Sequence, residues 1–196
     1  MTYLPFLVAL CGNPEAGKST AQTILFEEFG LTPIDDGRAC RDTGKAMFGL
    51  TEAQVTTQEG KAEYVTVCGQ QFQVRDLLGT VGELMERRYG EQIFPEAAIR
   101  RALADWRVRQ VMAGARGYTF GSVRKTQGKT YRSHERGHVL EIWRDGCQPS
   151  PYAFDRYDRS YISMAVENPL PFGAEPTPGL RARFRDNLLL TIKALM

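Results

Sequence analysis

The sequence has few of the features that build metal centres, disulfide frameworks or membrane spans. Its four cysteines show neither a C-x-x-C pair nor a zinc spacing, so free or buried thiols in a reducing compartment are expected. No apolar run approaches the roughly 20 residues of a membrane helix. The opening segment has no basic flank of the kind that a signal peptide carries, and no internal repeat or disordered tail appears. We therefore expect a soluble, cytoplasmic protein without a membrane partner, in an undetermined oligomeric state.

The most specific pattern in the chain follows the apolar run at 6–11. It is Gly12-Asn13-Pro14-Glu15-Ala16-Gly17-Lys18-Ser19, which fits the phosphate-binding loop G-x-x-x-x-G-K-[ST] in full and leads into a helical pattern at 20–29. The two glycines let successive N–H groups point inward at a helix start. Lys18 is expected to reach the β and γ phosphates, and the Ser19 hydroxyl to ligate Mg²⁺. ATP with Mg²⁺ is the expected ligand, held by Gly12, Asn13, Pro14, Glu15, Ala16, Gly17, Lys18, Ser19 and Thr20.

Short apolar segments separated by helical patterns predict an α/β fold. Right-handed crossovers between such segments produce a parallel sheet, and a chain of 196 residues suits one domain over 1–196. The strands are expected at 6–11, 31–34, 118–123, 138–143 and 162–166. Helices are expected at 18–29, 38–48, from 51, at 74–89, from 95 towards 113 and at 180–195, with a small hairpin or an irregular excursion around Gly69.

An acidic pair, Asp35-Asp36, follows the second expected strand and precedes Gly37-Arg38. Ligands in open α/β sheets bind beyond the carboxyl ends of the strands, so the pair should share a rim with Lys18. A hydroxyl acceptor must lose a proton, and a carboxylate is the usual group that takes it. A phosphate acceptor has no such need, and a carboxylate 4 Å away would repel it by about 4 kcal/mol. One of Asp35 and Asp36 is therefore expected to act as the base; capping of the helix that begins near Arg38 is the alternative.

The positive charge is concentrated in the middle of the chain. Residues 98–144 carry 11 Lys/Arg and 3 Asp/Glu, a net charge of +8, which indicates either a solvated face or a phosphate-binding surface. Segment 124–137 is basic, polar and rich in glycine, so we expect a mobile lid there. Within it, Arg132 or Arg136 is expected to neutralise the transferring phosphoryl group. His134 and His138 are expected at surface or strand positions, because phosphoryl transfer needs no imidazole.

Three segments of the sequence resemble the phage deoxynucleoside monophosphate kinases, a branch of the P-loop nucleoside monophosphate kinases. They are the phosphate-loop motif, Val74-Arg75-Asp76-Leu77-Leu78-Gly79-Thr80-Val81-Gly82, and Gly137-His138-Val139-Leu140-Glu141-Ile142-Trp143-Arg144-Asp145-Gly146. The resemblance implies a five-stranded parallel sheet with the phosphate loop on the central strand, an acceptor-binding insert at about 35–95 and an arginine-bearing lid. Arg75 matches a family arginine near the acceptor, and Arg144 one that follows the fourth strand.

The chain departs from this family in two places. The family usually has an acidic residue before Val-Arg at the end of its third strand, whereas here Ser122 precedes Val123-Arg124. The acidic pair is the other departure, and it is similar to an arrangement in phage polynucleotide kinase that serves a DNA hydroxyl.

Three functions remain open from the sequence. The first is an ATP-dependent kinase acting on a hydroxyl of a nucleotide within DNA, similar to the phage DNA kinases that phosphorylate 5-hydroxymethyluracil. The second is a deoxynucleoside monophosphate kinase. The third is a nucleotide-dependent DNA-binding switch, which would keep Lys18 but need no acceptor pocket. The expected acceptor-binding residues are Arg38, Arg41, Arg75, Arg88 and Arg124.

Overall fold

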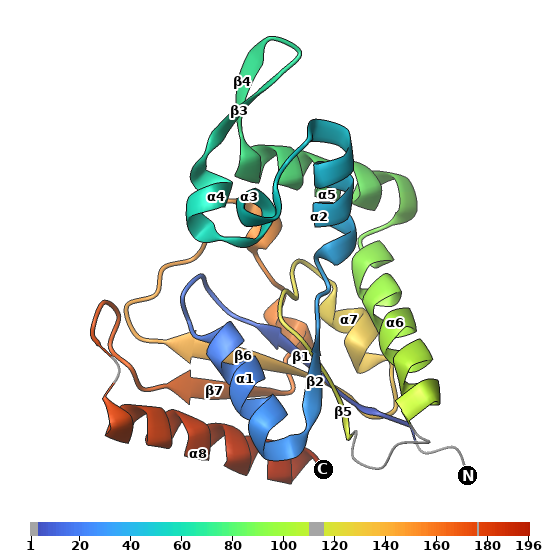
Figure 1. Ribbon diagram of the computed structural model, residues 1–196. Helices are drawn as coiled ribbons and strands as arrows, with labels where there is room; N and C mark the ends of the chain where they lie inside the picture. Colours follow the sequence, from blue (N-terminus) through green and yellow to red (C-terminus); the bar gives the residue numbers. More distant parts are fainter. Residues whose placement is uncertain (1–3, 110–115, 176) are drawn as a thin grey trace. The chain divides into compact units, whose positions relative to one another are not determined.

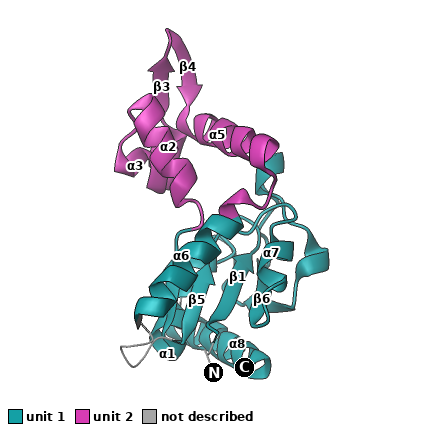
Figure 2. Ribbon diagram, turned by 90° about the vertical axis from the view of Figure 1, so that its right-hand side faces the viewer, with its two compact units in different colours: residues 1–35, 95–196 teal, residues 36–94 magenta. Residues whose placement is uncertain are grey.

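A computed structural model describes residues 4–109, 116–175 and 177–196 (Figure 1). The chain divides into two compact units, coloured separately in Figure 2. Unit 1 comprises residues 1–35 and 95–196, and unit 2 comprises residues 36–94. Among the described residues, none of the helices has the length and hydrophobicity needed to cross a bilayer.

Unit 1 contains a five-stranded parallel sheet with the order β2-β5-β1-β6-β7 (Figure 1). The predicted α/β fold with a five-stranded parallel sheet is therefore confirmed. The central strand is buried at every position, as expected for an apolar run that pairs on both sides. The strands are β1 (Phe6–Cys11), β2 (Leu31–Ile34), β5 (Gly117–Phe120), β6 (Gly137–Arg144) and β7 (Met164–Asn168).

Helices cover both faces of this sheet because alternate residues of β1 point to opposite sides. Phe6, Val8 and Leu10 pack in one core with side chains of α1 (Lys18–Phe29) and α8 (Pro178–Leu195). Leu7 and Ala9 pack in the other core, with α6 (Ile93–Arg109) and α7 (Gly128–Arg132). The loop after β1 is thus attached to a strand that is fixed from both faces.

Three expected elements differ in extent. The third strand ends at Phe120 rather than at 123, because the Val123 N–H leaves the β5 ladder and donates to the Leu10 carbonyl oxygen at 3.2 Å. The fifth strand starts at Met164 rather than at 162, since two short 3-10 turns, Ala153–Asp155 and Arg159–Tyr161, occupy the approach to it. Residues 110–113 of the helix expected from 95 towards 113 lie outside the described residues.

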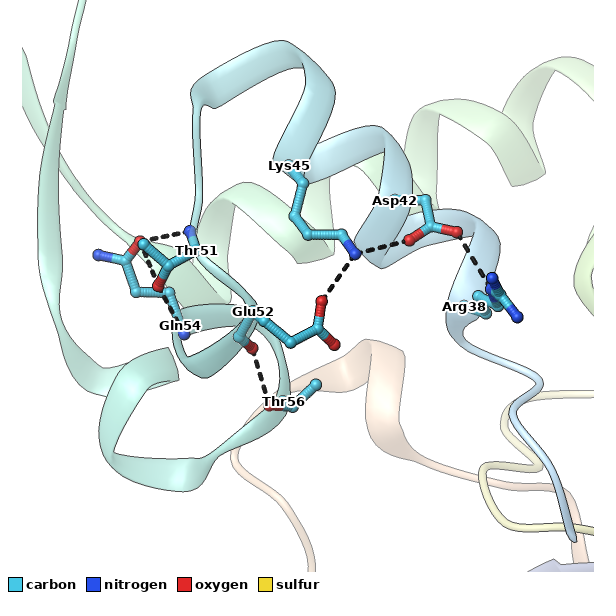
Figure 3. A network of polar contacts seen from close by, with 7 residues as sticks. All are labelled: Arg38, Asp42, Lys45, Thr51, Glu52, Gln54 and Thr56. Atoms are coloured by element: carbon cyan, nitrogen blue, oxygen red, sulfur yellow. Dashed lines mark hydrogen bonds and ion pairs between the residues drawn. The ribbon is translucent and has the colours of Figure 1, made fainter.

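Unit 2 is a small helical unit with a hairpin. Its helices are α2 (Arg38–Phe48), α3 (Glu52–Thr56), α4 (Gln58–Ala62) and α5 (Val74–Tyr89), and the hairpin joins β3 (Tyr64–Val67) to β4 (Gln70–Gln73). The hairpin predicted around Gly69 is confirmed, and both Cys68 and Gly69 have positive φ values, as a tight turn requires. Thr51 begins α3 through a reciprocal cap with Gln54 (Figure 3).

Candidate phosphate-binding site

The loop between β1 and α1 has a backbone that few residue types can adopt. Gly12 and Gly17 have φ values of 142° and 103°, and Glu15 between them has a φ of 62°. A Cβ atom on Gly12 would collide with the carbonyl oxygen of Ile142 in β6. The two glycines of the motif are therefore required by the curl of the chain and by its close approach to the neighbouring strand.

Three side-chain hydrogen bonds attach this loop to segments far away in the sequence. Asn168, the last residue of β7, donates from Nδ2 to the Ala16 carbonyl oxygen at 2.9 Å. Arg144 donates to the Glu15 carbonyl oxygen at 3.2 Å, and Asn13 donates to the Cys147 carbonyl oxygen at 3.0 Å. The bonds to Ala16 and Glu15 give these two loop carbonyls partners at the ends of β7 and β6.

The helix that follows the loop starts without a capping side chain. Gly17 is the N-cap of α1, and no side-chain hydrogen bond to the cap is seen among the described residues. The first N–H groups of a helix have no partner inside the helix, and the N-terminal end carries partial positive charge. This helix start is therefore suited to an anion.

Lys18 lies across the loop. Its Nζ donates to the carbonyl oxygens of Gly12 at 2.7 Å and Asn13 at 2.8 Å. Burial lowers the pKa of Lys18, while Cys11 and Asp155 raise it and Arg124 lowers it further. A phosphate would be a stronger partner than a neutral carbonyl for an ammonium removed from water.

Ser19 is the residue of this loop expected to ligate a magnesium ion. Ser19 is exposed in the first turn of α1, and the described residues contain no group of three or more His, Cys, Asp or Glu side chains that could hold a metal. Mg²⁺ keeps several waters and takes phosphate oxygens in nucleotide sites. The exposed Ser19 hydroxyl fits that kind of coordination.

Arg124 is the expected acceptor-binding arginine that lies in unit 1. The bond from Val123 to Leu10 holds the preceding residue beside the end of β1. The Arg124 Nε lies 3.3 Å from Asp155 Oδ1. Its guanidinium carbon lies 5.7 Å from the centre of the Phe154 ring. The sequence did not single out Asp155, because its segment has no motif and no regular helix or strand that would reveal it.

The two arginines expected to neutralise the phosphoryl group are not brought to Lys18. Arg136 donates to the Leu4 carbonyl oxygen at 2.9 Å and lies over the Phe6 ring, at the amino edge of the sheet. Six residues of strand separate that edge from Gly12, a length of roughly 20 Å. Arg136, one of the two candidates for neutralising the phosphoryl group, therefore lies at the opposite end of β1 from the loop. Arg132 donates instead to Ser163 Oγ at 2.8 Å.

Segment 124–137, expected to form a mobile lid, is attached to the core of unit 1 by one aromatic side chain. The segment contains α7, and its Tyr131 is only 1% exposed. The ring of Tyr131 packs 4.8 Å from that of Phe120 in the core beneath β5. The polar and basic composition of this segment predicted a lid, because its one buried aromatic residue, Tyr131, is outnumbered by charged residues.

The acidic pair is divided between the two units. Asp35 follows β2 in unit 1, at the same carboxyl edge as the loop and two strands from β1, and its backbone carbonyl accepts a hydrogen bond from Arg101 at 2.6 Å. Asp36 begins unit 2 and is buried. The N-cap of α2 is Gly37, so neither aspartate occupies the capping position considered as their alternative role.

The remaining expected acceptor arginines belong to unit 2. Arg38 forms an ion pair with Asp42 at 3.3 Å, and Asp42 also pairs with Lys45 at 2.9 Å (Figure 3). The positive charges of Arg38 and Lys45 on α2 are thus partly compensated by Asp42 on the same helix. Arg75 donates to Gln58 at 2.6 Å; Arg41 lies against Gly37, and Arg88 is exposed in the last turn of α5.

A buried carboxylate beside the loop was missed by the sequence-based analysis. Glu141 pairs in register with Cys11, the residue before Gly12, and is 4% exposed. It accepts hydrogen bonds from the Tyr157 hydroxyl at 2.7 Å and from Arg159 at 2.6 Å. The pKa of the Cys11 thiol is raised to about 12, mainly by burial and secondly by the negative charge of Glu141. The signal in the sequence that could have revealed Glu141 was the presence of a charged residue inside the apolar run 138–143.

No family model matches the sequence, and no curated protein matches it. Solved structures match over nearly the whole chain. A protein from Thermus thermophilus has 16% identity and a TM-score of 0.45, covering 98% of each chain. Shikimate kinase from Aquifex aeolicus has 15% identity and a TM-score of 0.40, over 96% of this chain and 97% of that one. Dephospho-CoA kinase from Campylobacter jejuni has 10% identity and a TM-score of 0.40, over 96% of each. The fold class rests on the strand order and the loop rather than on these likenesses.

Proposed function

We propose that this chain is an ATP-dependent phosphotransferase. The observation that supports this most directly is the loop itself, in which Lys18 lies across a backbone curl at an uncapped helix start. A nucleoside triphosphate supplies the anion that such a loop accommodates, and the exposed Ser19 hydroxyl suits the accompanying Mg²⁺.

The proposed acceptor is a hydroxyl group of a nucleotide, with 5-hydroxymethyluracil in DNA as the best candidate. In the reaction, the acceptor oxygen forms a bond to the γ phosphorus, the bond from that phosphorus to the β–γ bridging oxygen breaks, and ADP leaves. The acceptor proton passes to a carboxylate, for which Asp35 or Asp36 is the candidate. The support is the acidic pair after β2, the net charge of +8 over 98–144, and the similarity of this profile to phage DNA kinases.

A deoxynucleoside monophosphate acceptor is the second candidate. It is favoured by Arg38, Arg41, Arg75 and Arg88 of unit 2, because guanidinium groups bind phosphate in a bidentate manner. Arg75 extends from the first turn of α5 and is held by Gln58, and Arg88 is exposed at the other end of that helix. In this reaction the acceptor oxygen already carries the negative charge, so the acidic pair would have no proton to accept.

Labelled phosphate transfer tests the proposal. The protein is incubated with γ-labelled ATP and Mg²⁺, in parallel with hydroxymethyluracil-containing DNA and with free deoxynucleoside monophosphates. We expect labelled DNA, and no label with Lys18→Ala. Label in nucleoside diphosphates alone would select the second candidate. ATP hydrolysis without a labelled acceptor would favour the nucleotide-dependent DNA-binding switch, and the absence of ATP binding would overturn the kinase proposal as a whole.

A further inference from the structure

The Arg124 guanidinium is held by side chains from one short stretch of chain, 150–155. Asp155 Oδ1 forms an ion pair with the guanidinium Nε at 3.3 Å, and the Phe154 ring centre lies 5.7 Å from the central carbon of the guanidinium. The other oxygen of Asp155, Oδ2, accepts from the Ser150 hydroxyl at 2.9 Å, and Ser150 in turn accepts from the Tyr152 N–H at 3.2 Å. Both oxygens of the carboxylate therefore have defined partners, which fixes its direction.

The ion pair with Asp155 occupies the Nε edge of the guanidinium and leaves its two terminal nitrogens available for a ligand. The contact with Asp155 uses Nε, and the two terminal nitrogens of Arg124 have no hydrogen-bond partner among the described residues. The side chain is 43% exposed, whereas that of Asp155 is 18% exposed. A guanidinium held at Nε presents its terminal N–H groups in the fork that matches two phosphate oxygens.

The site also lies at the correct end of the sheet. Val123 is bonded to Leu10, two residues before Gly12. The 150–155 stretch follows Cys147, whose carbonyl oxygen accepts from Asn13 of the phosphate loop. One backbone hydrogen bond and one bond from the Asn13 side chain therefore bring Arg124 and the 150–155 stretch to the loop that carries Lys18.

We propose that Asp155 is a positioning residue that orients Arg124 toward the γ phosphate of ATP bound at the loop. This inference rests on the proposed function and assigns to Arg124 the task first expected of Arg132 or Arg136. Asp155 acts through Arg124 and does not touch the nucleotide. Because ADP lacks the γ phosphate, the Asp155–Arg124 pair contributes to binding of the triphosphate and not of the diphosphate.

An opposite role for Asp155 predicts an opposite result. A carboxylate near Lys18 could compete with phosphate for the positive charges, and its removal would then tighten triphosphate binding. The structure favours positioning, because Arg124 forms an ion pair with one oxygen of Asp155 and compensates its charge, while the Ser150 hydroxyl donates to the other oxygen. The sign of the change in affinity separates the two roles.

The test compares binding of a non-hydrolysable ATP analogue with binding of ADP, measured by calorimetric titration of the full chain with Mg²⁺. We expect Asp155→Asn to weaken the ATP analogue about tenfold, the size of a lost charge-assisted contact, with ADP affinity changed less than about twofold. Asp158→Asn is the matched control, since Asp158 Oδ1 accepts from the Ser160 N–H in the same connection and an amide oxygen preserves that bond. It should bind both nucleotides as the parent does.

A double-mutant cycle shows whether Asp155 acts through Arg124. Arg124→Ala should weaken the analogue at least as much as Asp155→Asn, and the double variant should be no weaker than Arg124→Ala alone. Any of three results would overturn the inference. They are additive losses of affinity in the double variant, equal losses of affinity for ADP and the analogue, and tighter binding of the analogue by Asp155→Asn. Because the readout is binding, a parent chain that binds ATP but transfers no phosphate would refute the proposed function and leave this test valid.

Discussion

The side-chain amide of Asn168 donates to the backbone carbonyl oxygen of Ala16 at 2.9 Å. The last residue of β7 thus holds the middle of the phosphate-binding loop, although the two residues lie at opposite ends of the chain. Asn168 is 3% exposed, and its Oδ1 accepts from the Leu170 N–H. The loop geometry therefore depends on the edge of the sheet as well as on the glycines of the motif.

Replacement of Asn168 should affect both stability and nucleotide binding. Asn168→Ala leaves the buried Ala16 carbonyl without its donor, which costs about 1–3 kcal/mol of unfolding free energy and loosens the loop, so we expect ATP affinity to fall about tenfold. Asn187→Ala is the matched control, because Asn187 Nδ2 donates at 3.0 Å to the carbonyl oxygen of Glu167, a residue of β7, and not to a residue of the loop. Denaturant unfolding and ATP titration measure the two effects. Equal ATP affinity in both variants would show that Asn168 does not shape the loop.

Gly17 should tolerate no side chain. Its φ is 103°, and an added Cβ would lie 2.5 Å from Asn168 Nδ2, so Gly17→Ala should break the contact with Asn168 and abolish ATP binding. Gly49→Ala serves as the control, because Gly49 also has a positive φ, of 67°, with no atom within 4 Å of an added Cβ. That variant should lose about 1–2 kcal/mol of stability from backbone strain and still bind ATP. Retained binding by a folded Gly17→Ala would contradict the prediction.

The acidic pair should matter for a hydroxyl acceptor only. If one aspartate accepts the acceptor proton, Asp35→Asn or Asp36→Asn should lower the transfer rate to hydroxymethyluracil DNA about 10²–10⁴-fold, with ATP affinity nearly unchanged. Steady-state kinetics with labelled ATP measure this, and Asp186→Asn, an exposed position on α8, controls for loss of one negative charge. Near-parent rates for both variants would remove the pair from the mechanism.

His138 should make stability depend on pH below neutrality. Burial lowers the pKa of His138 below its usual 6.5, and the nearby Arg132 and Arg136 lower it further, while the Phe6 ring lies 5.1 Å from the imidazole. The unfolded chain therefore binds a proton at a higher pH than the folded chain. Unfolding free energy should fall as the pH drops from 6.5 through the folded-state pKa.

Denaturant unfolding at a series of pH values measures this slope. His138→Gln should make it shallower, and His134→Gln, which changes the other histidine, should leave it in place. An unchanged slope in His138→Gln would assign the pH dependence to other groups.

The cysteines should differ in reactivity. Cys68 is exposed in the hairpin turn, whereas Cys11 is buried and its pKa is raised to about 12. The thiolate is the reactive form, so an alkylating reagent at about pH 8 should modify Cys68 in the folded chain and Cys11 only after unfolding. Peptide mass mapping with and without urea measures both. Rapid native modification of Cys11 would show that β1 is not shielded as described.

The sequence determined those features whose cause is local. The apolar run 6–11 became the central strand, and the helix from Lys18 to Phe29 ended at Gly30 in the left-handed conformation that a stop signal predicts. The helix at 74–89 and the hairpin around Gly69 also formed where periodicity and turn residues placed them. The helix ends and the hairpin depend on contacts between residues close together in the chain, and the apolar run 6–11 is itself a local pattern, although its strand partners at 117–120 and 137–141 are distant.

Tertiary structure decided which distant side chains meet the loop. Arg124, Arg132 and Arg136 look alike in the basic segment, yet the bond from Val123 to Leu10 draws the first to the carboxyl edge of the sheet, while pairing of β6 with β1 holds Arg136 at the amino edge. Asp155 and Asn168 reach the site from the far end of the chain and carry no motif. Strand order and register set these positions, and a local pattern of residues contains neither.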